Sequence, residues 1–246
     1  MKRILVKAAL AVAASVGISA AQAALIVNYG HSFGGSAENS GATATATFTF
    51  STYDGSIAFG GTGIDVLLAI TVQNTTPTPP STATIVGLAL EIPTPPGPIG
   101  GSGYYNAGTS GFANFLMNSG FNGNGGAGWG ASFDVCVRTG NTPNCAGGNP
   151  TEGLAKGESG TLYFGFDTTL TAAEVEQAFS DLYTGAACPS AIRVQQISGA
   201  SNGAGSDKIC GELAVNDDPE LLPEPGVAAL LGLGLAALAM RRRRRD

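Results

Sequence analysis

Four cysteines carry the most definite chemistry in this sequence: Cys136, Cys145, Cys188 and Cys210. Four cysteines can pair in more than one way, or they can bind zinc. We favour Cys136 with Cys145 and Cys188 with Cys210, because each pair flanks a turn rich in Gly, Asn or Pro that can close locally. Zinc is the weaker alternative, since there is no Cys-x-x-Cys and the single histidine, His31, is far along the chain.

Three glycine-rich segments match known functional motifs, but each lacks the neighbouring residues or elements that its motif needs. Residues 60–67 match the calcium-binding nonapeptide repeat, which builds its ion site only from stacked copies. Residues 199–203 fit the nucleophile elbow of serine hydrolases, yet no histidine follows to complete a triad. Residues 123–128 contain the dinucleotide fingerprint, but no strand leads into it. We therefore assign no catalytic, cofactor-binding or metal-binding residue and expect no enzyme activity. Calcium binding, and hydrolysis by an unplaced pair of carboxylates, stay open.

Three aromatic residues lie in or beside a glycine-rich segment: Tyr104, Tyr105 and Trp129. Exposed aromatic side chains on a β-sandwich commonly form the platform on which a sugar ring stacks. For Trp129 the alternative is a core position at the start of a strand, because tryptophan is highly buried on average. The segment 104–129 therefore offers carbohydrate binding as one function of this protein.

Alternating side chains predict the elements that position these residues. Between 41 and 50, threonines alternate with Ala and Phe as on a half-buried strand: Thr43, Thr45, Thr47 and Thr49. A threonine row also suggests ice binding, but one row without tandem copies is usually the solvated face of a strand. Further strands are predicted at 25–29, 64–72, 83–92, 129–138, 160–166, 191–197 and 209–215. Their spacing predicts an all-β fold, a jelly-roll-like antiparallel β-sandwich, in one domain over 24–218.

Two local signals refine this fold. Proline clusters at 77–80 and 93–98 bracket the strand 83–92, which we expect at a sheet edge or crossing between sheets. A capping box of Thr171 and Glu174 predicts a helix over 172–183. The apolar side chains of this helix share one face, which is expected to pack on a sheet as core: Val175, Ala178, Phe179 and Leu182.

The N-terminus has the order of a signal peptide. Lys2, Arg3 and Lys7 precede an apolar stretch, and residues 21–23 form the small-x-small pattern that signal peptidase accepts. Residues 1–23 are therefore predicted to form a signal helix, and the cysteines to meet an oxidising compartment. Between residues 24 and 225, 17 acidic residues outnumber four basic ones. Such a surface repels phosphates, so nucleic acid is not an expected partner.

The C-terminus has three parts in sequence. Pro223, Glu224 and Pro225 are followed by an uncharged apolar run over 226–240, and then by consecutive arginines: Arg241, Arg242, Arg243, Arg244 and Arg245. The apolar run is predicted to be a short transmembrane helix, with the arginines on the cytoplasmic side.

This arrangement over residues 221–246 resembles the PEP-CTERM sorting signal of Gram-negative bacteria. The resemblance implies that exosortase, a membrane enzyme, recognises the Pro-Glu-Pro segment and removes the tail, in organisms that make extracellular polysaccharide and biofilm matrix. Residues 191–195 followed by 205–208 also look like the segment that often precedes such tails. A plain tail anchor without processing stays open.

These features predict an exported protein that is held for a time in the inner membrane and then reaches the cell surface or extracellular matrix. A structural or adhesive role in biofilm is the leading expectation. A carbohydrate-binding module is the alternative, and an extracytoplasmic hydrolase is the weaker third class. The expected partners are signal peptidase, exosortase, the inner membrane through the tail, and extracellular polysaccharide. No cofactor is expected.

Overall fold

The computed structural model describes residues 24–32, 35–120, 132–141, 145 and 147–214, which all belong to one compact unit. The predicted signal peptide at 1–23, the sorting tail at 221–246 and Trp129 lie outside these described residues. Within the described part of the chain, no helix has both the length and the apolar character needed to span a bilayer.

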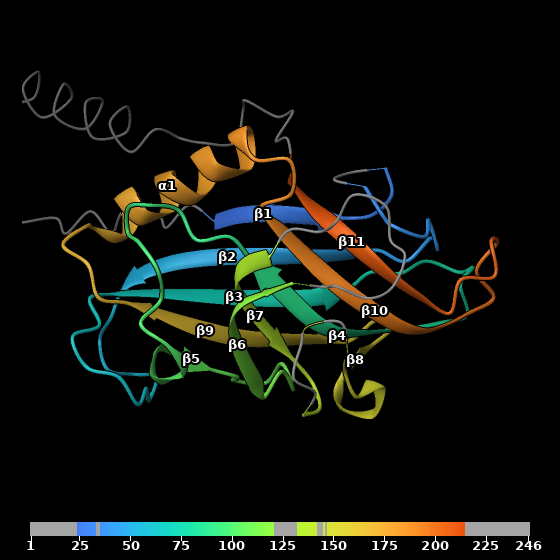
Figure 1. Cartoon of the computed structure of the whole chain (residues 1–246), viewed down its shortest axis with the longest axis horizontal. Coiled ribbons are helices and arrows are strands. Elements are labelled where there is room, and N and C mark those ends of the chain that lie inside the picture. Colours follow the sequence, from blue (N-terminus) through green and yellow to red (C-terminus); the bar gives the residue numbers. More distant parts are fainter. Residues whose placement is uncertain (1–23, 33–34, 121–131, 142–144, 146, 215–246) are drawn as a thin grey trace, which may run out of the picture. The chain divides into compact units, whose positions relative to one another are not determined.

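The described residues form an 11-stranded sheet and one α-helix. Figure 1 shows the strands lying beside α1, which covers Ala172–Gly185. The strands in chain order are β1 (Ala24–Tyr29), β2 (Ala44–Thr52), β3 (Val66–Asn74), β4 (Thr82–Leu90), β5 (Tyr105–Asn106), β6 (Asn114–Gly120), β7 (Ser132–Arg138), β8 (Leu154–Ala155), β9 (Ser159–Phe166), β10 (Ser190–Ser198) and β11 (Ser206–Leu213). Short 3-10 helices cover Ser102–Tyr104 and Pro150–Glu152.

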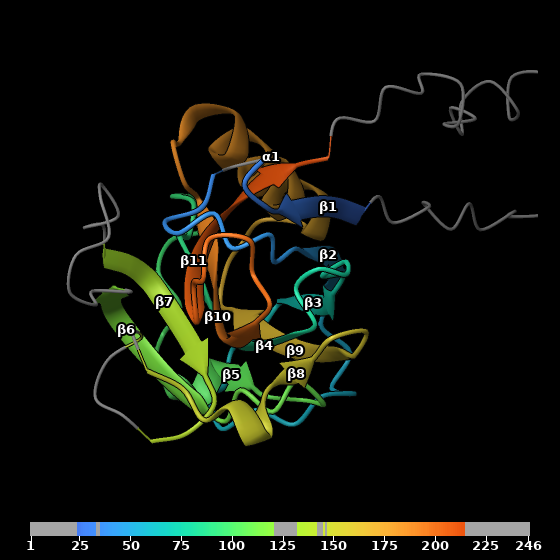
Figure 2. The same ribbon diagram turned by 90° about the vertical axis from the view of Figure 1, so that its right-hand side faces the viewer.

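All strand pairs are antiparallel, and the order across the sheet is β5-β9-β3-β2-β1-β11-β10-β4-β7-β6, with β8 beside β4. The predicted class, antiparallel all-β with one packed helix, is thereby confirmed. The two sheets expected of a sandwich are instead two halves of one sheet, because β1 pairs with β2 on one side and with β11 on the other. Figure 2 shows β2 and β3 on one side of the unit and β6 and β7 on the other.

The core lies between these halves. On most strands, every second side chain points into it. On β2, Phe48 and Phe50 are buried while the intervening threonines are half-buried, which matches the predicted alternation. Leu68 on β3 and Phe164 on β9 are buried in the same half of the sheet, and Leu88 on β4 is buried in the other half. Burial of such apolar side chains is the main favourable term in folding.

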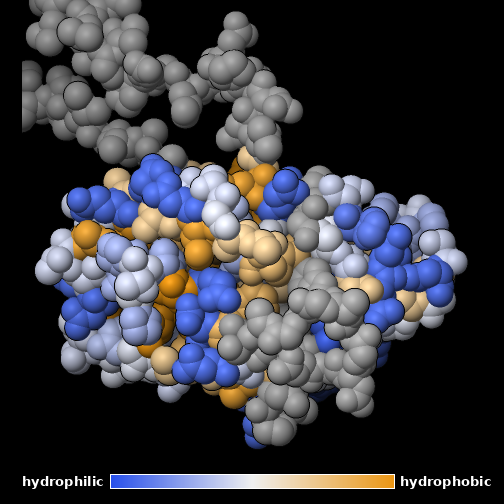
Figure 3. Space-filling view, turned by 45° about the horizontal axis from the view of Figure 1, so that its top comes forward, coloured by the Kyte–Doolittle hydropathy of each residue, from blue (hydrophilic) through white to orange (hydrophobic). Residues whose placement is uncertain are grey.

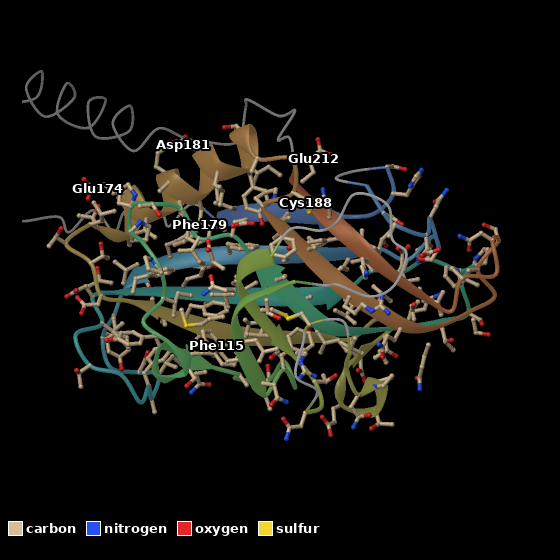
Figure 4. The ribbon with its side chains drawn as sticks, in the orientation of Figure 1. Phe115, Glu174, Phe179, Asp181, Cys188 and Glu212 are labelled. Carbon is tan, nitrogen blue, oxygen red and sulfur yellow. A yellow bond between two sulfur atoms is a disulfide. The ribbon has the colours of Figure 1, made fainter. Side chains whose placement is uncertain are left out.

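Helix α1 begins with the predicted capping box. The Thr171 hydroxyl accepts a hydrogen bond from the Glu174 amide, and the Glu174 carboxylate accepts one from the Thr171 amide at 2.8 Å. Val175 and Phe179 are buried on its inner face, whereas Ala178 and Leu182 are half-buried, so the predicted apolar stripe is core at two of its four positions. In Figure 4, Phe179 points from α1 toward the strands, whereas Glu174 and Asp181 lie away from them.

Strand β4 is central, and the expectation of an edge position was wrong. It lies between β10 and β7, and every residue from Ala83 to Leu90 is buried. The physical reason is that both proline clusters fall outside the strand, in the segments before Thr82 and after Leu90. Proline weakens a central strand only where it removes a ladder donor, and none lies within β4.

Residues 105–120 of the glycine-rich segment after Tyr104 are more regular in structure than their composition indicates. It contains the short strand β5 and the seven-residue strand β6, which the sequence did not predict. Because β7 is the one partner of β6 among the described strands, the side chains of β6 are mostly half-exposed and Met117 is 41 % exposed. An edge strand with so little burial shows only weak alternation, which explains why it was missed.

Both cysteine pairs favoured by the sequence are bonded. Cys136 joins Cys145 across nine residues, and Cys188 joins Cys210 across 22. The first disulfide connects β7 to the following loop, and the second connects the segment after α1 to β11. Disulfides persist in oxidising compartments, so the pairs point to an extracytoplasmic environment.

Candidate functional site

A pocket of about 390 Å³ opens where the 96–100 segment meets the end of β9. The side chains that give it chemical character are Tyr104, Phe166 and Asp167. Phe166 is almost fully buried, Tyr104 is half-buried and Asp167 is exposed. An aromatic ring beside a carboxylate is a combination that can contact a sugar through stacking and hydrogen bonding.

Two glycines hold the Tyr104 ring in place. A Cβ added to Gly61 would lie 2.8 Å from the ring, and one added to Gly100 would lie 2.7 Å from it. The Tyr104 hydroxyl also donates a hydrogen bond to the carbonyl of Thr62 at 2.8 Å. The glycines of the 60–67 segment therefore let its backbone pack against Tyr104, which is a structural use of the residues that resemble a calcium repeat.

Two carboxylates stand at this end of β3 and β9. The Asp65 carboxylate accepts a hydrogen bond from the Thr168 amide at 3.1 Å. Gly63 has a φ of +75°, and a Cβ added there would lie 2.9 Å from Oδ2 of Asp167. Over the described ranges, no three His, Cys, Asp or Glu side chains gather into a metal site.

The three aromatic residues predicted to contact sugar fall in different surroundings. Tyr104 lines the pocket. Tyr105 packs its ring 5.5 Å from that of Phe115 and 5.2 Å from that of Phe164, and its hydroxyl donates to the Phe112 carbonyl. Burial raises the pKa of the Tyr105 hydroxyl. Trp129 lies outside the described residues.

A second candidate is the outward face of β1, β2, β3 and β9, which we call the threonine face. Strand pairing places its small and polar residues side by side: Ala24, Ile26, Asn28, Thr45, Thr47, Thr49, Ala69, Thr71, Gln73, Ser159, Thr161 and Tyr163. In the central row Ile26 pairs with Thr47, Thr47 with Thr71, and Thr71 with Thr161. None of these twelve positions is occupied by Asp, Glu, Lys or Arg.

Tyr163 is the only aromatic residue among these positions, and the sequence analysis did not single it out. The available signal was alternation along β9, where Leu162 and Phe164 are buried and Tyr163 is half-buried. The alternation shows that Tyr163 points outward. It does not show that the neighbouring strands present threonines beside it.

Asp207 is the centre of a buried polar cluster on β11. Its carboxylate accepts hydrogen bonds from the Ser36 hydroxyl at 2.6 Å and the Ser40 hydroxyl at 2.7 Å. It also accepts from the backbone amides of Glu38, Ser40 and Lys208, at 2.9, 3.0 and 2.8 Å. Asp207 therefore fastens the 36–40 loop to β11, which is a structural role for the residues 205–208 that the sequence singled out.

Two basic residues lie opposite each other on the paired strands β10 and β11. Arg193 lies opposite Lys208, and its guanidinium donates to the Ser206 hydroxyl at 3.2 Å. Burial lowers the pKa of Arg193, while the negative charges of Asp207 and Glu38 oppose that shift.

Glu91 and Asp134 form a pair of half-buried carboxyls at the ends of β4 and β7. Desolvation by burial, the Asp134 charge and a hydrogen bond to Asp134 together raise the pKa of Glu91 to about 7. Glycoside hydrolysis needs carboxyl groups about 5–9.5 Å apart, with the scissile bond between them. Two carboxyls in hydrogen-bond contact leave no such space, so this pair does not fit that chemistry.

The Glu91 carboxyl should make stability depend on pH. Its pKa is 4.5 ordinarily and about 7 in the fold, so the folded protein holds an extra proton between these values. This contribution is complete below about pH 4.5 and is lost as the pH rises through about 7. Partial exposure limits its size to about 1 kcal/mol.

We expect Glu91→Gln to flatten the dependence and to unfold at higher urea than wild type at pH 8. Urea midpoints measured from pH 5 to 8 test this, with the exposed Glu212→Gln as the matched control. A wild-type pH dependence in Glu91→Gln would contradict the assignment.

Comparisons with protein-family models, curated proteins and solved structures found no match for this chain. Figure 3 shows hydrophobic residues interspersed among hydrophilic ones on the face that it presents.

Proposed function

We propose that this chain is a non-enzymatic surface or extracellular-matrix protein of a Gram-negative bacterium, exported and then sorted through its C-terminus by exosortase. The observation that carries the proposal is the order of Pro223-Glu224-Pro225, an uncharged apolar run and five arginines at the end of the sequence. In this order the Pro-Glu-Pro segment serves as the recognition motif, the apolar run holds the chain in the inner membrane, and the arginines orient it.

The folded unit supports delivery to an oxidising space. Two disulfides join segments of the unit that lie nine and 22 residues apart. Cross-links of this kind stabilise a domain mainly by restricting its unfolded state. That is useful to a protein that works outside the cell, and it supports a structural or adhesive role in biofilm.

Carbohydrate binding is the second candidate, and the pocket at Tyr104 favours it. The ring packs against Gly61 and Gly100, and the exposed Asp167 lines the same pocket. A rigid aromatic surface loses little entropy when a ligand stacks on it. This candidate is compatible with the first, because a matrix protein has polysaccharide as its neighbour.

A double-tagged chain tests the sorting proposal. One epitope tag follows Asp246, and a second is inserted beside Thr169, an exposed residue between β9 and α1. We expect the extracellular fraction to carry the inner tag without the tail tag. We expect Glu224→Ala to leave both tags together in the membrane fraction, whereas the matched change Glu220→Ala, outside the Pro-Glu-Pro motif, should behave as wild type. Extracellular wild-type protein that still carried the tail tag would refute processing.

A further inference from the structure

We propose that the threonine face binds a neutral, hydroxyl-rich polysaccharide chain, with the ring of Tyr163 as the stacking platform. The inference rests on the proposed function in that it names the chemistry of the matrix partner. It assigns the contact to the outward face of β1, β2, β3 and β9 rather than to the pocket at Tyr104.

The hydroxyls of this face form a regular array. Adjacent strands lie about 4.8 Å apart, and alternate residues along a strand lie about 6.7 Å apart. Thr47, Thr71 and Thr161 occupy one row across three strands, and the hydroxyls of Thr71 and Thr161 are 2.9 Å apart. A threonine hydroxyl has one donor and two acceptor sites, so one such bond leaves capacity for a ligand. The array can therefore exchange hydrogen bonds with successive sugar hydroxyls.

The lack of charged residues on the threonine face favours a neutral polysaccharide over an anionic one. The span 24–225 holds 17 acidic and four basic residues, yet none of them occupies a position of the threonine face. A neutral chain can lie across β2, β3 and β9 without desolvating a charged side chain of these strands, which is the costly step in burying polar surface. The charge that strand pairing places at the border of the face is Glu212 of β11, opposite Asn28. An anionic chain gains no cationic partner there, and the remaining acidic surface repels it.

Tyr163 is supported so that its ring stays in place. Across β3 its neighbour is Ala69, a small side chain, and on β5 its neighbour is Asn106. The Asn106 amide donates to the Ala58 carbonyl at 2.9 Å and accepts from the Gly108 amide at 2.8 Å, which holds the adjoining turn. A Cβ added to Gly108 would lie 2.8 Å from the Tyr163 ring, so the turn fits against the ring edge only with glycine.

Two other ligands, a second copy of this chain and an ice surface, would require a different kind of face. A stable dimer typically buries about 1,200–2,000 Å² with a core richer in apolar side chains than threonine supplies. An ice lattice needs a flat array, whereas adjacent strands are rotated by about 20–25° through sheet twist. A flexible glycan chain requires only local matching over a few residues. The glycan therefore fits this surface best.

Affinity electrophoresis of the full chain tests the proposal. The protein is secreted into an oxidising compartment, purified in detergent with its disulfides intact, and run through gels that contain barley β-glucan, dextran or alginate. We expect retardation by a neutral glucan and none by the anionic alginate. Tyr163→Ala should weaken binding about tenfold or more, while Tyr163→Phe, which keeps the ring, should bind as wild type.

Two matched threonine variants test whether binding depends on the threonine face itself or only on the total charge of the protein. Thr71→Glu puts a negative charge into the central row, and Thr169→Glu puts the same charge on an exposed residue outside the face. We expect loss of binding in the first and wild-type binding in the second. Thermal unfolding checks that each variant is folded, and Thr71→Glu keeps the test decisive if Tyr163→Ala does not fold.

Several results would overturn the proposal. These are no retardation by either neutral glucan, unchanged binding in folded Thr71→Glu, or a threonine-face-dependent dimer or ice-growth inhibition in place of glucan binding. Because the assay uses purified protein, it does not depend on processing of the tail. If the protein binds glucan but keeps its tail in cells, the sorting proposal is wrong and the glycan-binding proposal is unaffected.

Discussion

Replacing Phe179 with alanine is expected to lower the free energy of unfolding by about 3–5 kcal/mol. The side chain is 1 % exposed and fills the space between α1 and the sheet. Its ring centroid lies 6.3 Å from that of Phe48, 5.2 Å from that of Phe50 and 6.1 Å from that of Phe166. Truncation would remove all three ring contacts and leave a cavity, because helix and sheet can only partly close around it.

Urea unfolding with the disulfides oxidised measures this loss. Phe179→Leu should lose less, since it keeps most of the apolar volume. Gln177→Ala on the exposed side of the same helix is the matched control, and should change stability by no more than about 0.5 kcal/mol. A loss below about 1 kcal/mol in Phe179→Ala would mean that α1 is not anchored through this ring.

Asp207→Ala should lower the free energy of unfolding by about 3–5 kcal/mol. The carboxylate is fully buried and accepts bonds from the hydroxyls of Ser36 and Ser40 and from three backbone amides. Alanine would leave these donors without an acceptor inside the protein. An unsatisfied buried donor costs far more than the net gain of one hydrogen bond.

The effect of Asp207→Ala should be local before it is global. The 36–40 loop loses its attachment to β11, so amide exchange of Glu38 and Ser40 should accelerate more than that of β2. Asp207→Asn keeps the shape and one acceptor oxygen, and should lose about half as much stability. Uniform acceleration across β2 and the loop would contradict the assigned role, as would wild-type stability in Asp207→Ala.

Sequence reasoning located most elements of this fold because their signals are local. The alternation of threonine with Ala and Phe placed β2, and the Thr171–Glu174 capping box placed the start of α1. Cysteine spacing placed both disulfides, since each pair closes a short segment of chain. These features depend on residues close together in sequence, which is why the sequence shows them.

The errors follow from neighbours that the sequence does not show. The prolines around β4 suggested an edge, but strand pairing puts β4 between β10 and β7. The predicted start of β11 was at Ile209, whereas the strand begins at Ser206. Ser206, Asp207 and Lys208 have no apolar pattern, and Asp207 is buried only because the distant 36–40 loop supplies its donors.

The residues of the candidate sites also differ in whether the local sequence reveals them. Tyr104 was recognised from its type and its glycine-rich surroundings, yet its contact with Gly61 joins residues 43 positions apart. Tyr163 went unnoticed because a lone tyrosine that alternates with buried residues is an ordinary feature of a strand. Its surroundings became visible only through the pairing of β3 with β9 and of β5 with β9.

The sequence by itself determined the strand alternation, the helix cap, the cysteine pairs, and the expectation of export and sorting. Tertiary structure alone decided which strands are neighbours. It therefore decided that a threonine row on one strand becomes a charge-free face across four, and that a buried aspartate holds a loop about 170 residues away in the chain. The physical reason is that each strand's pattern specifies which side chains point outward. The register with its partners, set by packing of the whole core, specifies what lies beside them.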